Sequence, residues 1–171
     1  MSPAETFAVR RVAALPSLLV VVAALALAAG CRSRPPERAV VPPAPPPVAV
    51  GDTLAQAALA QLGTPYRYGG STPAGFDCSG LVLHVHERAG IDVPRTAAQQ
   101  FRAARPVDVT ELAPGDLVFF RTQRRGVDHV GVYVGQGRFV HAPRSARPVS
   151  LEELDDAYYM ARFAGAGRFW R

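Results

Sequence analysis

The pattern of apolar and polar positions divides the chain into an apolar amino-terminal run, a proline-rich segment and a longer segment of mixed polarity. The apolar run covers 15–29, follows Arg10 and Arg11, and ends in small residues before Cys31. A charged start, a short apolar core and a small-residue end are typical of a secretory signal. The run is also short for a membrane-spanning helix. We therefore expect residues 1–30 to be a lipoprotein signal peptide and Cys31 to be lipidated; an uncleaved anchor helix is the alternative.

Residues 31–50 are predicted to be a spacer. Seven prolines lie between Arg32 and Val50. Proline fixes φ and donates no backbone hydrogen bond, so this stretch should be extended polyproline II and not helix or sheet. We interpret it as a linker that holds a domain away from a membrane. A ligand for a proline-binding partner is the weaker alternative.

A helical period begins after the spacer. Apolar residues at 54, 58, 59 and 62 predict a helix over Asp52–Leu62 with Asp52 as N-cap. Turn-forming and aromatic residues predict a surface loop over 66–73. A second helix is expected from Asp77 to about Arg88, closed by Gly90, and a short third helix over Arg95–Arg102.

The period changes to two in the second half of the domain. Strands are predicted over 116–121, 128–134 and 138–141, a short helix over 151–158, and a last strand over 160–169. Helices first and an antiparallel sheet second describe an α+β fold. The 121 residues of 51–171 suit one domain with one core.

The charge and the cysteine content of the chain limit the classes of function that the domain can have. The chain carries +5, but residues 51–171 hold 14 arginines and 12 acidic residues, a net +2. No basic stripe interleaved with aromatics appears, so we expect no nucleic-acid partner.

If Cys31 is lipidated, Cys78 has no partner in its own chain. An unpaired thiol in an exported, oxidising compartment is either buried and inert or kept for chemistry.

Cys78 is predicted to stand in the first turn of the second helix. Free amides and the positive end of the helix dipole there favour a thiolate, although the neighbouring Asp77 opposes it. A nucleophilic cysteine usually needs an imidazole base. On a helix, His84 faces away from Cys78 and His86 lies about 12 Å further along the axis.

Two histidines on β-segments, His129 and His141, remain as candidate partners of the thiol. A sheet packed on the helix can present both at the Cys78 end. His129 shares one strand face with Gly131, which suggests a site. On the strand pattern alone, a structural role for His129 is the favoured alternative.

Five strings resemble the NlpC family of cell-wall cysteine peptidases, and together they cover nearly all of 51–171. They are Thr64–Gly70 followed by Phe76–Val82, Pro94–Thr96 with Gln99-Gln100, Leu112–Phe120, His129–Gly135, and Phe139–Ala142. Each string alone is a weak signal, but five in register are strong.

The resemblance implies a compact papain-like fold and a set of site residues. It makes Cys78 the nucleophile, His129 the general base and His141 the residue that orients the base. It implies that Tyr66 lines the site and helps hold the oxyanion together with the Cys78 amide.

Asp77 and Ser79 belong to the motif around the nucleophile and are candidate substrate contacts. Asp77 is equally well explained as a helix cap. Arg67 and Arg95 are alternatives for binding substrate carboxylates, although we favour a solvated surface position for both.

The expected function is hydrolysis of peptide bonds in peptidoglycan stems or crosslinks through a thioester, without a cofactor or metal. The protein is expected to be a monomer tethered by its lipid. Arg32 after the lipid cysteine favours sorting to the periplasmic face of an outer membrane. Three rivals remain: a metal site of Cys78, His129 and His141, acyl transfer or amide cleavage on lipids or small molecules, and a catalytically dead wall-binding module.

Overall fold

A computed structural model describes residues 47–171 except 124–125 and 145–146. The predicted signal peptide, Cys31, Arg32 and most of the proline-rich spacer lie outside the described residues. Within the described part, no helix has the length and apolar character that a membrane crossing requires.

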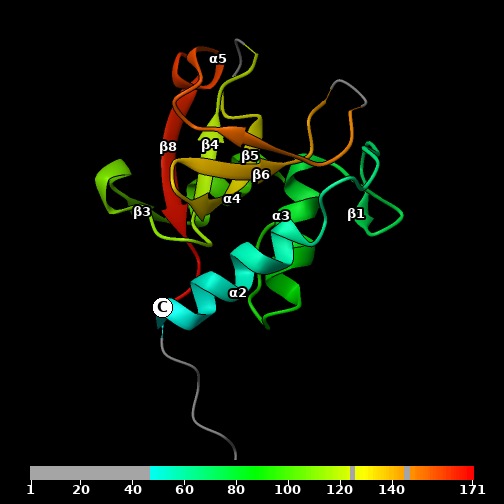
Figure 1. The fold of residues 1–171 in the computed structure, drawn as a ribbon, viewed down its shortest axis with the longest axis horizontal. Helices are drawn as coiled ribbons and strands as arrows, with labels where there is room; N and C mark the ends of the chain where they lie inside the picture. Colours follow the sequence, from blue (N-terminus) through cyan, green and yellow to red (C-terminus); the bar gives the residue numbers. More distant parts are fainter. Residues whose placement is uncertain (1–46, 124–125, 145–146) are drawn as a thin grey trace, which may run out of the picture. The chain divides into compact units, whose positions relative to one another are not determined.

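The central element is a six-stranded antiparallel sheet in the order β3-β8-β4-β5-β6-β7 (Figure 1). The strands are β3 (Arg105–Val107), β4 (Leu117–Phe120), β5 (His129–Gly135), β6 (Arg138–His141), β7 (Ser150–Glu153) and β8 (Phe163–Arg168). A separate two-stranded hairpin consists of β1 (Ser71–Thr72) and β2 (Gly75–Phe76). The predicted α+β fold is confirmed.

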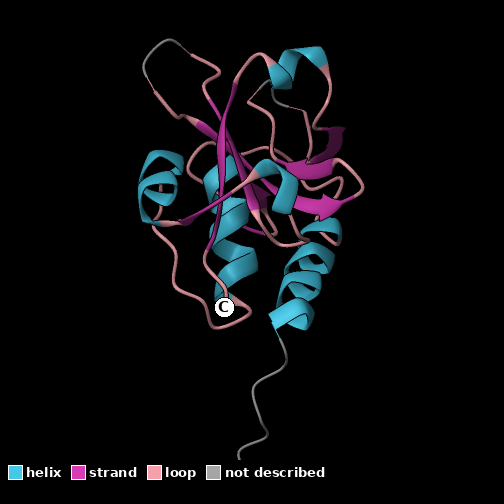
Figure 2. Cartoon of the chain, turned by 90° about the vertical axis from the view of Figure 1, so that its left-hand side faces the viewer, coloured by secondary structure: helices cyan, strands magenta, loops and turns pink. Residues whose placement is uncertain are grey.

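Three helices contact the central strand β5: α2 (Pro47–Leu59), α3 (Cys78–Glu87) and α4 (Ala97–Ala103). Figure 2 shows these helices together with the strands of the sheet. Alternation along the strands directs Val130 and Val132 of β5 into the larger core, which includes buried residues of α2 and α3. The fully buried Phe120 and Phe139 belong to a second cluster, which also contains Tyr159 of α5 (Ala157–Met160).

Two predicted elements were placed wrongly. The first helix begins at Pro47, so Asp52 lies inside it and is not its N-cap. Proline is tolerated at a helix start because the first amides have no partner within the helix. The predicted helix over 151–158 begins instead as strand β7, which pairs with β6 from His141–Ser150 to Arg138–Glu153. The helical segment there is only the single turn α5.

Two other predictions agree closely with the structure. The second helix begins at Cys78 with Asp77 as N-cap, and Gly90 has a positive φ of 71° beyond its end. The third helix begins two residues later than predicted and carries a capping box between Thr96 and Gln99. Sequence reasoning missed β3 and the 3-10 turn η1 (Val109–Glu111), and it treated the β1–β2 hairpin as loop.

Candidate active site

Cys78 is the first residue of α3 and is 8% exposed. The Asp77 side chain caps the helix by accepting a hydrogen bond from the Gly80 amide at 2.7 Å. The Cys78 thiol is 4.0 Å from the Asp128 carbonyl oxygen, and the nearby Val130 amide lowers the pKa of the sulfur. These two backbone groups flank His129, so the helix start places the sulfur against the chain at the beginning of β5.

A close backbone approach positions the loop beside this helix start. A Cβ atom at Gly80 would collide with the Gly70 carbonyl, so the first turn of α3 sits directly against the loop that precedes β1. Asp77 strengthens the contact, because its amide donates to the Gly70 carbonyl at 3.0 Å and its carboxylate accepts from the Gly69 amide at 3.0 Å. The Tyr66 loop is thereby held next to Cys78.

The pKa of the Cys78 thiol is raised to about 11, mainly by burial and further by the charge of Asp77. The amides of Val130 and Ser79 and the charge of Arg144 lower this pKa, but they do not outweigh burial. Burial therefore opposes the thiolate that the helix start favours in the protein without substrate. Removal of the sulfur from water opposes its ionisation more than the helix start favours it.

The structure brings the two predicted histidines together. His129 Nε2 lies 2.7 Å from His141 Nδ1, and the two rings stand at 88° to each other with their centroids 5.0 Å apart. Both side chains are buried, and burial lowers the pKa of His129 to about 4 and that of His141 to about 2. Both imidazoles are therefore uncharged at neutral pH.

The surroundings of His141 favour one arrangement of protons on the two imidazoles. Its Nε2 faces three oxygens: the Tyr159 hydroxyl at 3.3 Å, the Ser150 hydroxyl at 3.4 Å and a Glu152 carboxylate oxygen at 3.8 Å. Ser150 in turn lies 3.3 Å from the same carboxylate oxygen and can donate to it. A proton on His141 Nε2 satisfies these acceptors and leaves Nδ1 to accept a hydrogen bond from His129.

With this tautomer, His129 carries its proton on Nε2, and its Nδ1 is the basic nitrogen. The thiol and the His129 ring are not hydrogen-bonded in the described part of the chain, where the sulfur contacts the Asp128 carbonyl instead. Catalytic hydrogen bonds are often long in proteins without substrate. Sequence reasoning missed Ser150, Glu152 and Tyr159, because no local pattern links them to His141.

Asp77, Ser79 and Arg95 form a polar cluster beside the thiol. Arg95 binds both carboxylate oxygens of Asp77, at 2.6 and 3.0 Å, and donates to the Ser79 hydroxyl at 3.0 Å. Arg95 is thus paired within the site, and its side chain remains 38% exposed. Arg67 is exposed, as expected. The pKa of Asp77 is lowered, because the hydrogen bonds from Arg95 and Gly80 together outweigh its burial.

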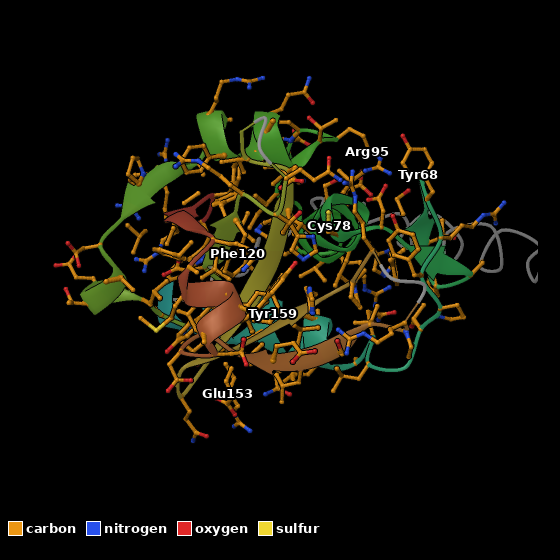
Figure 3. The ribbon with its side chains drawn as sticks, turned by 90° about the horizontal axis from the view of Figure 1, so that it is seen from above. Tyr68, Cys78, Arg95, Phe120, Glu153 and Tyr159 are labelled. Atoms are coloured by element: carbon orange, nitrogen blue, oxygen red, sulfur yellow. The ribbon has the colours of Figure 1, made fainter. Side chains whose placement is uncertain are left out.

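We use the name cysteine cavity for the space of about 440 Å³ that Cys78 lines together with Tyr66, Asp77, Ser79 and Arg95. Figure 3 shows Cys78 at the start of α3 with Arg95 and Tyr68 on one side and Phe120 and Tyr159 on the other. The pKa of Tyr66 is raised by burial and by the nearby Cys78. Tyr66 lines the same space as the thiol.

The two remaining histidines pack within the fold. The His84 ring lies 5.1 Å from the Phe76 ring, and His86 is fully buried with Nδ1 2.9 Å from the Val82 carbonyl oxygen. Their exclusion as partners of Cys78 agrees with these positions. Among the described residues, no group of three metal-ligating side chains is arranged to hold a metal ion.

Comparison with known proteins identifies the family. The model of the NlpC/P60 family matches residues 63–168. This chain belongs to the NlpC/P60 family. A solved structure of a family member from Bacillus cereus is 37% identical, covers 71% of this chain and 40% of its own, and superposes with a TM-score of 0.67. The resemblance and the fold predicted from it are confirmed.

Two relatives carry functional names. The murein DD-endopeptidase MepH of Escherichia coli is 48% identical over 115 residues, which are 64% of this chain and 42% of the relative. The gamma-D-glutamyl-L-lysine dipeptidyl-peptidase of Bacillus cereus is 38% identical over 125 residues, which are 72% of this chain and 38% of the relative. The chain therefore matches less than half the length of these relatives.

Proposed function

We propose that this protein is a cysteine peptidase that hydrolyses peptide bonds in peptidoglycan stems or crosslinks. The observation that carries the proposal is the buried bond between His129 and His141 at the same strand end that Cys78 contacts. Membership of the NlpC/P60 family and the names of the two relatives support a peptide substrate.

The proposed reaction begins with a neutral thiol and a neutral imidazole. Nδ1 of His129 takes the proton from Cys78 as the sulfur attacks the scissile carbonyl carbon, and His141 holds the ring through Nε2. The imidazolium then gives that proton to the leaving nitrogen as the carbon–nitrogen bond breaks. This leaves a thioester on Cys78, which water hydrolyses with His129 again acting as base.

Proton transfer in this scheme coincides with attack. Burial opposes a standing pair of thiolate and imidazolium, because it raises the pKa of Cys78 and lowers that of His129. The bound substrate carbonyl must therefore accept the negative charge as it forms. The Cys78 amide and the Tyr66 hydroxyl are the proposed donors to this oxyanion.

Asp77 and Ser79 are proposed substrate contacts on the acyl side of the bond. Both line the cysteine cavity, and Arg95 fixes both in place. Asp77 also caps α3, so the cap and the substrate contact are compatible roles for one carboxylate.

We also propose that the domain is exported and anchored by a lipid on Cys31, at the periplasmic face of an outer membrane. The charged start, the apolar run 15–29 and the small residues before Cys31 support export and lipidation. Arg32 supports the outer membrane.

Purified sacculi provide the test. His129→Ala should lower the release of wall fragments by at least about 100-fold, the usual range for loss of a general base. His84→Ala is the matched control, because His84 lies on the same helix as Cys78 and contacts Phe76. Equal losses in the two variants would overturn the assignment of the base. Release of no fragment by the wild type, with retained binding to sacculi, would favour the binding module.

Cleavage of a lipid or small-molecule amide in place of sacculi would favour the other enzymatic rival. Full activity in the presence of a chelator is expected, and loss of activity that added zinc restores would favour the metal site.

A further inference from the structure

A second cavity, of about 360 Å³, lies beside the histidine pair and is lined by His129 and His141. We call it the histidine cavity. Cys78 is absent from its described lining, and Arg144 is the one described residue that lines both cavities. Tyr159, which lines the histidine cavity, and Arg95, which lines the cysteine cavity, lie on opposite sides of Cys78 in Figure 3.

The chemistry gives the two cavities different roles. During acyl transfer the acyl group becomes bonded to the Cys78 sulfur, whereas the protonated imidazole of His129 donates its proton to the leaving nitrogen. The leaving residue must therefore lie next to His129. Of the two cavities, the histidine cavity is the one that His129 lines, which places it on the leaving side of the bond.

The charged lining of the histidine cavity has both signs. Arg144 and Arg147 contribute two guanidinium groups, and Glu152 and Asp156 contribute two carboxylates. The Arg144 side chain is 47% exposed and that of Arg147 is 61% exposed, so a ligand in the cavity can reach both. Guanidinium groups bind carboxylates through paired hydrogen bonds. A residue released with an ammonium group beside a free carboxylate matches this lining.

We propose that the histidine cavity binds the leaving residue and selects one whose carboxylate, next to the leaving nitrogen, is free. This inference rests on the proposed function and narrows its substrate. A crosslink from D-alanine to diaminopimelate meets the condition, because the leaving centre carries its own carboxylate. The bond from D-glutamate to diaminopimelate does not meet it when the stem continues, because that carboxyl group is then part of the next peptide bond.

A free carboxylate at the leaving centre distinguishes two activities that the names of the relatives leave open. One relative is named a DD-endopeptidase and the other a gamma-D-glutamyl-L-lysine peptidase. Arg147 is the residue to test, since it pairs with Glu152 at 3.7 Å and lines the histidine cavity only. Arg144 is less suitable, because its charge also lowers the pKa of Cys78.

The experiment compares three defined substrates with the full chain: a crosslinked muropeptide dimer, the same dimer with the carboxylate of the leaving centre amidated, and an uncrosslinked tetrapeptide stem. The free-acid dimer should have a kcat/KM at least about tenfold above the amidated dimer, mostly through KM, as expected for one charged hydrogen bond. Arg147→Gln should bring this ratio close to one. Arg105→Gln should leave it unchanged, because Arg105 is exposed on β3 at the opposite edge of the sheet from β7.

Equal cleavage of the two dimers by the wild type would overturn the inference while the peptidase remains. Preferred cleavage of the stem would do the same. The wild-type ratio decides the matter even if Arg147→Gln fails to fold. An unchanged ratio in a folded Arg147→Gln protein would remove Arg147 from the subsite. Failure of the wild type to cleave any wall peptide would overturn the proposed function, and this inference with it.

Discussion

Iodoacetamide should modify Cys78 slowly at neutral pH, because the pKa of its thiol is raised to about 11. Only the thiolate reacts, and an unperturbed cysteine has a pKa of about 8.5. At pH 7 the thiolate fraction is then about 1 in 10,000, against about 1 in 30 for an unperturbed thiol. The native protein should therefore react about 300-fold more slowly than the same chain unfolded in urea.

The pH dependence separates ionisation from simple shielding of the sulfur. Measured by mass spectrometry in a Cys31→Ser chain, the rate should rise about tenfold per pH unit without a plateau up to pH 10. Asp77→Asn should shift this profile to lower pH, because the Asp77 charge raises the pKa of the thiol. Asp92→Asn is the control, since Asp92 is exposed in the loop after α3. A plateau below pH 9 would refute the electrostatic reasoning.

Three further perturbations test the fold and the anchor. Arg168→Met should lower the free energy of unfolding in urea by roughly 3–5 kcal/mol, because it leaves the carboxylate of Asp116 buried without its charged partner. Arg168 binds the two oxygens of this carboxylate at 2.6 and 2.7 Å. A loss below about 1 kcal/mol would show that the ion pair contributes little to stability. Burial holds the pKa of His86 at about 4, below about 6.5 in the unfolded chain, so the unfolded state binds more protons between these values. His86 should thus contribute up to about 3 kcal/mol to the fall in stability from pH 6.5 to 4, in addition to the contributions of His129 and His141. His86→Gln should make the fall in stability with decreasing pH shallower. An unchanged slope would contradict the lowered pKa of His86. Cys31→Ser should give unlipidated protein that is either longer than the mature form or released in soluble form, whereas unchanged membrane binding together with unchanged migration would refute lipidation.

The sequence pattern was sufficient to predict the helices and strands that depend mainly on neighbouring residues. Asp77 followed by a small polar residue and an apolar run predicted the start of α3, and alternation predicted β4, β5 and β6. The segment 151–158 was mistaken because its acidic and leucine residues favour helix. Pairing of β7 with β6 overrides that preference.

The sequence indicated the candidates Cys78, His129 and His141, but not the burial and the long-range contacts that set their electrostatics. The sequence placed Cys78 at a helix start, and a helix start alone favours a thiolate. Burial of the sulfur depends on β5 and on the loop before β1, neither of which is local to α3. The ion pair of Arg95 with Asp77 and the oxygens around His141 join residues from separate elements. Such contacts leave no periodic trace in a single sequence.

Wall cleavage by Cys78→Ser tests the central claim most directly. The hydroxyl is nearly isosteric with the thiol but is hard to ionise, so the variant should fold with the melting temperature of the wild type and lose activity. Muropeptides released from purified sacculi, separated by chromatography and identified by mass, give the measurement. Nucleophilic catalysis by Cys78 predicts fragments from the wild type and none from the folded variant. Release by Cys78→Ser at the wild-type rate would contradict it.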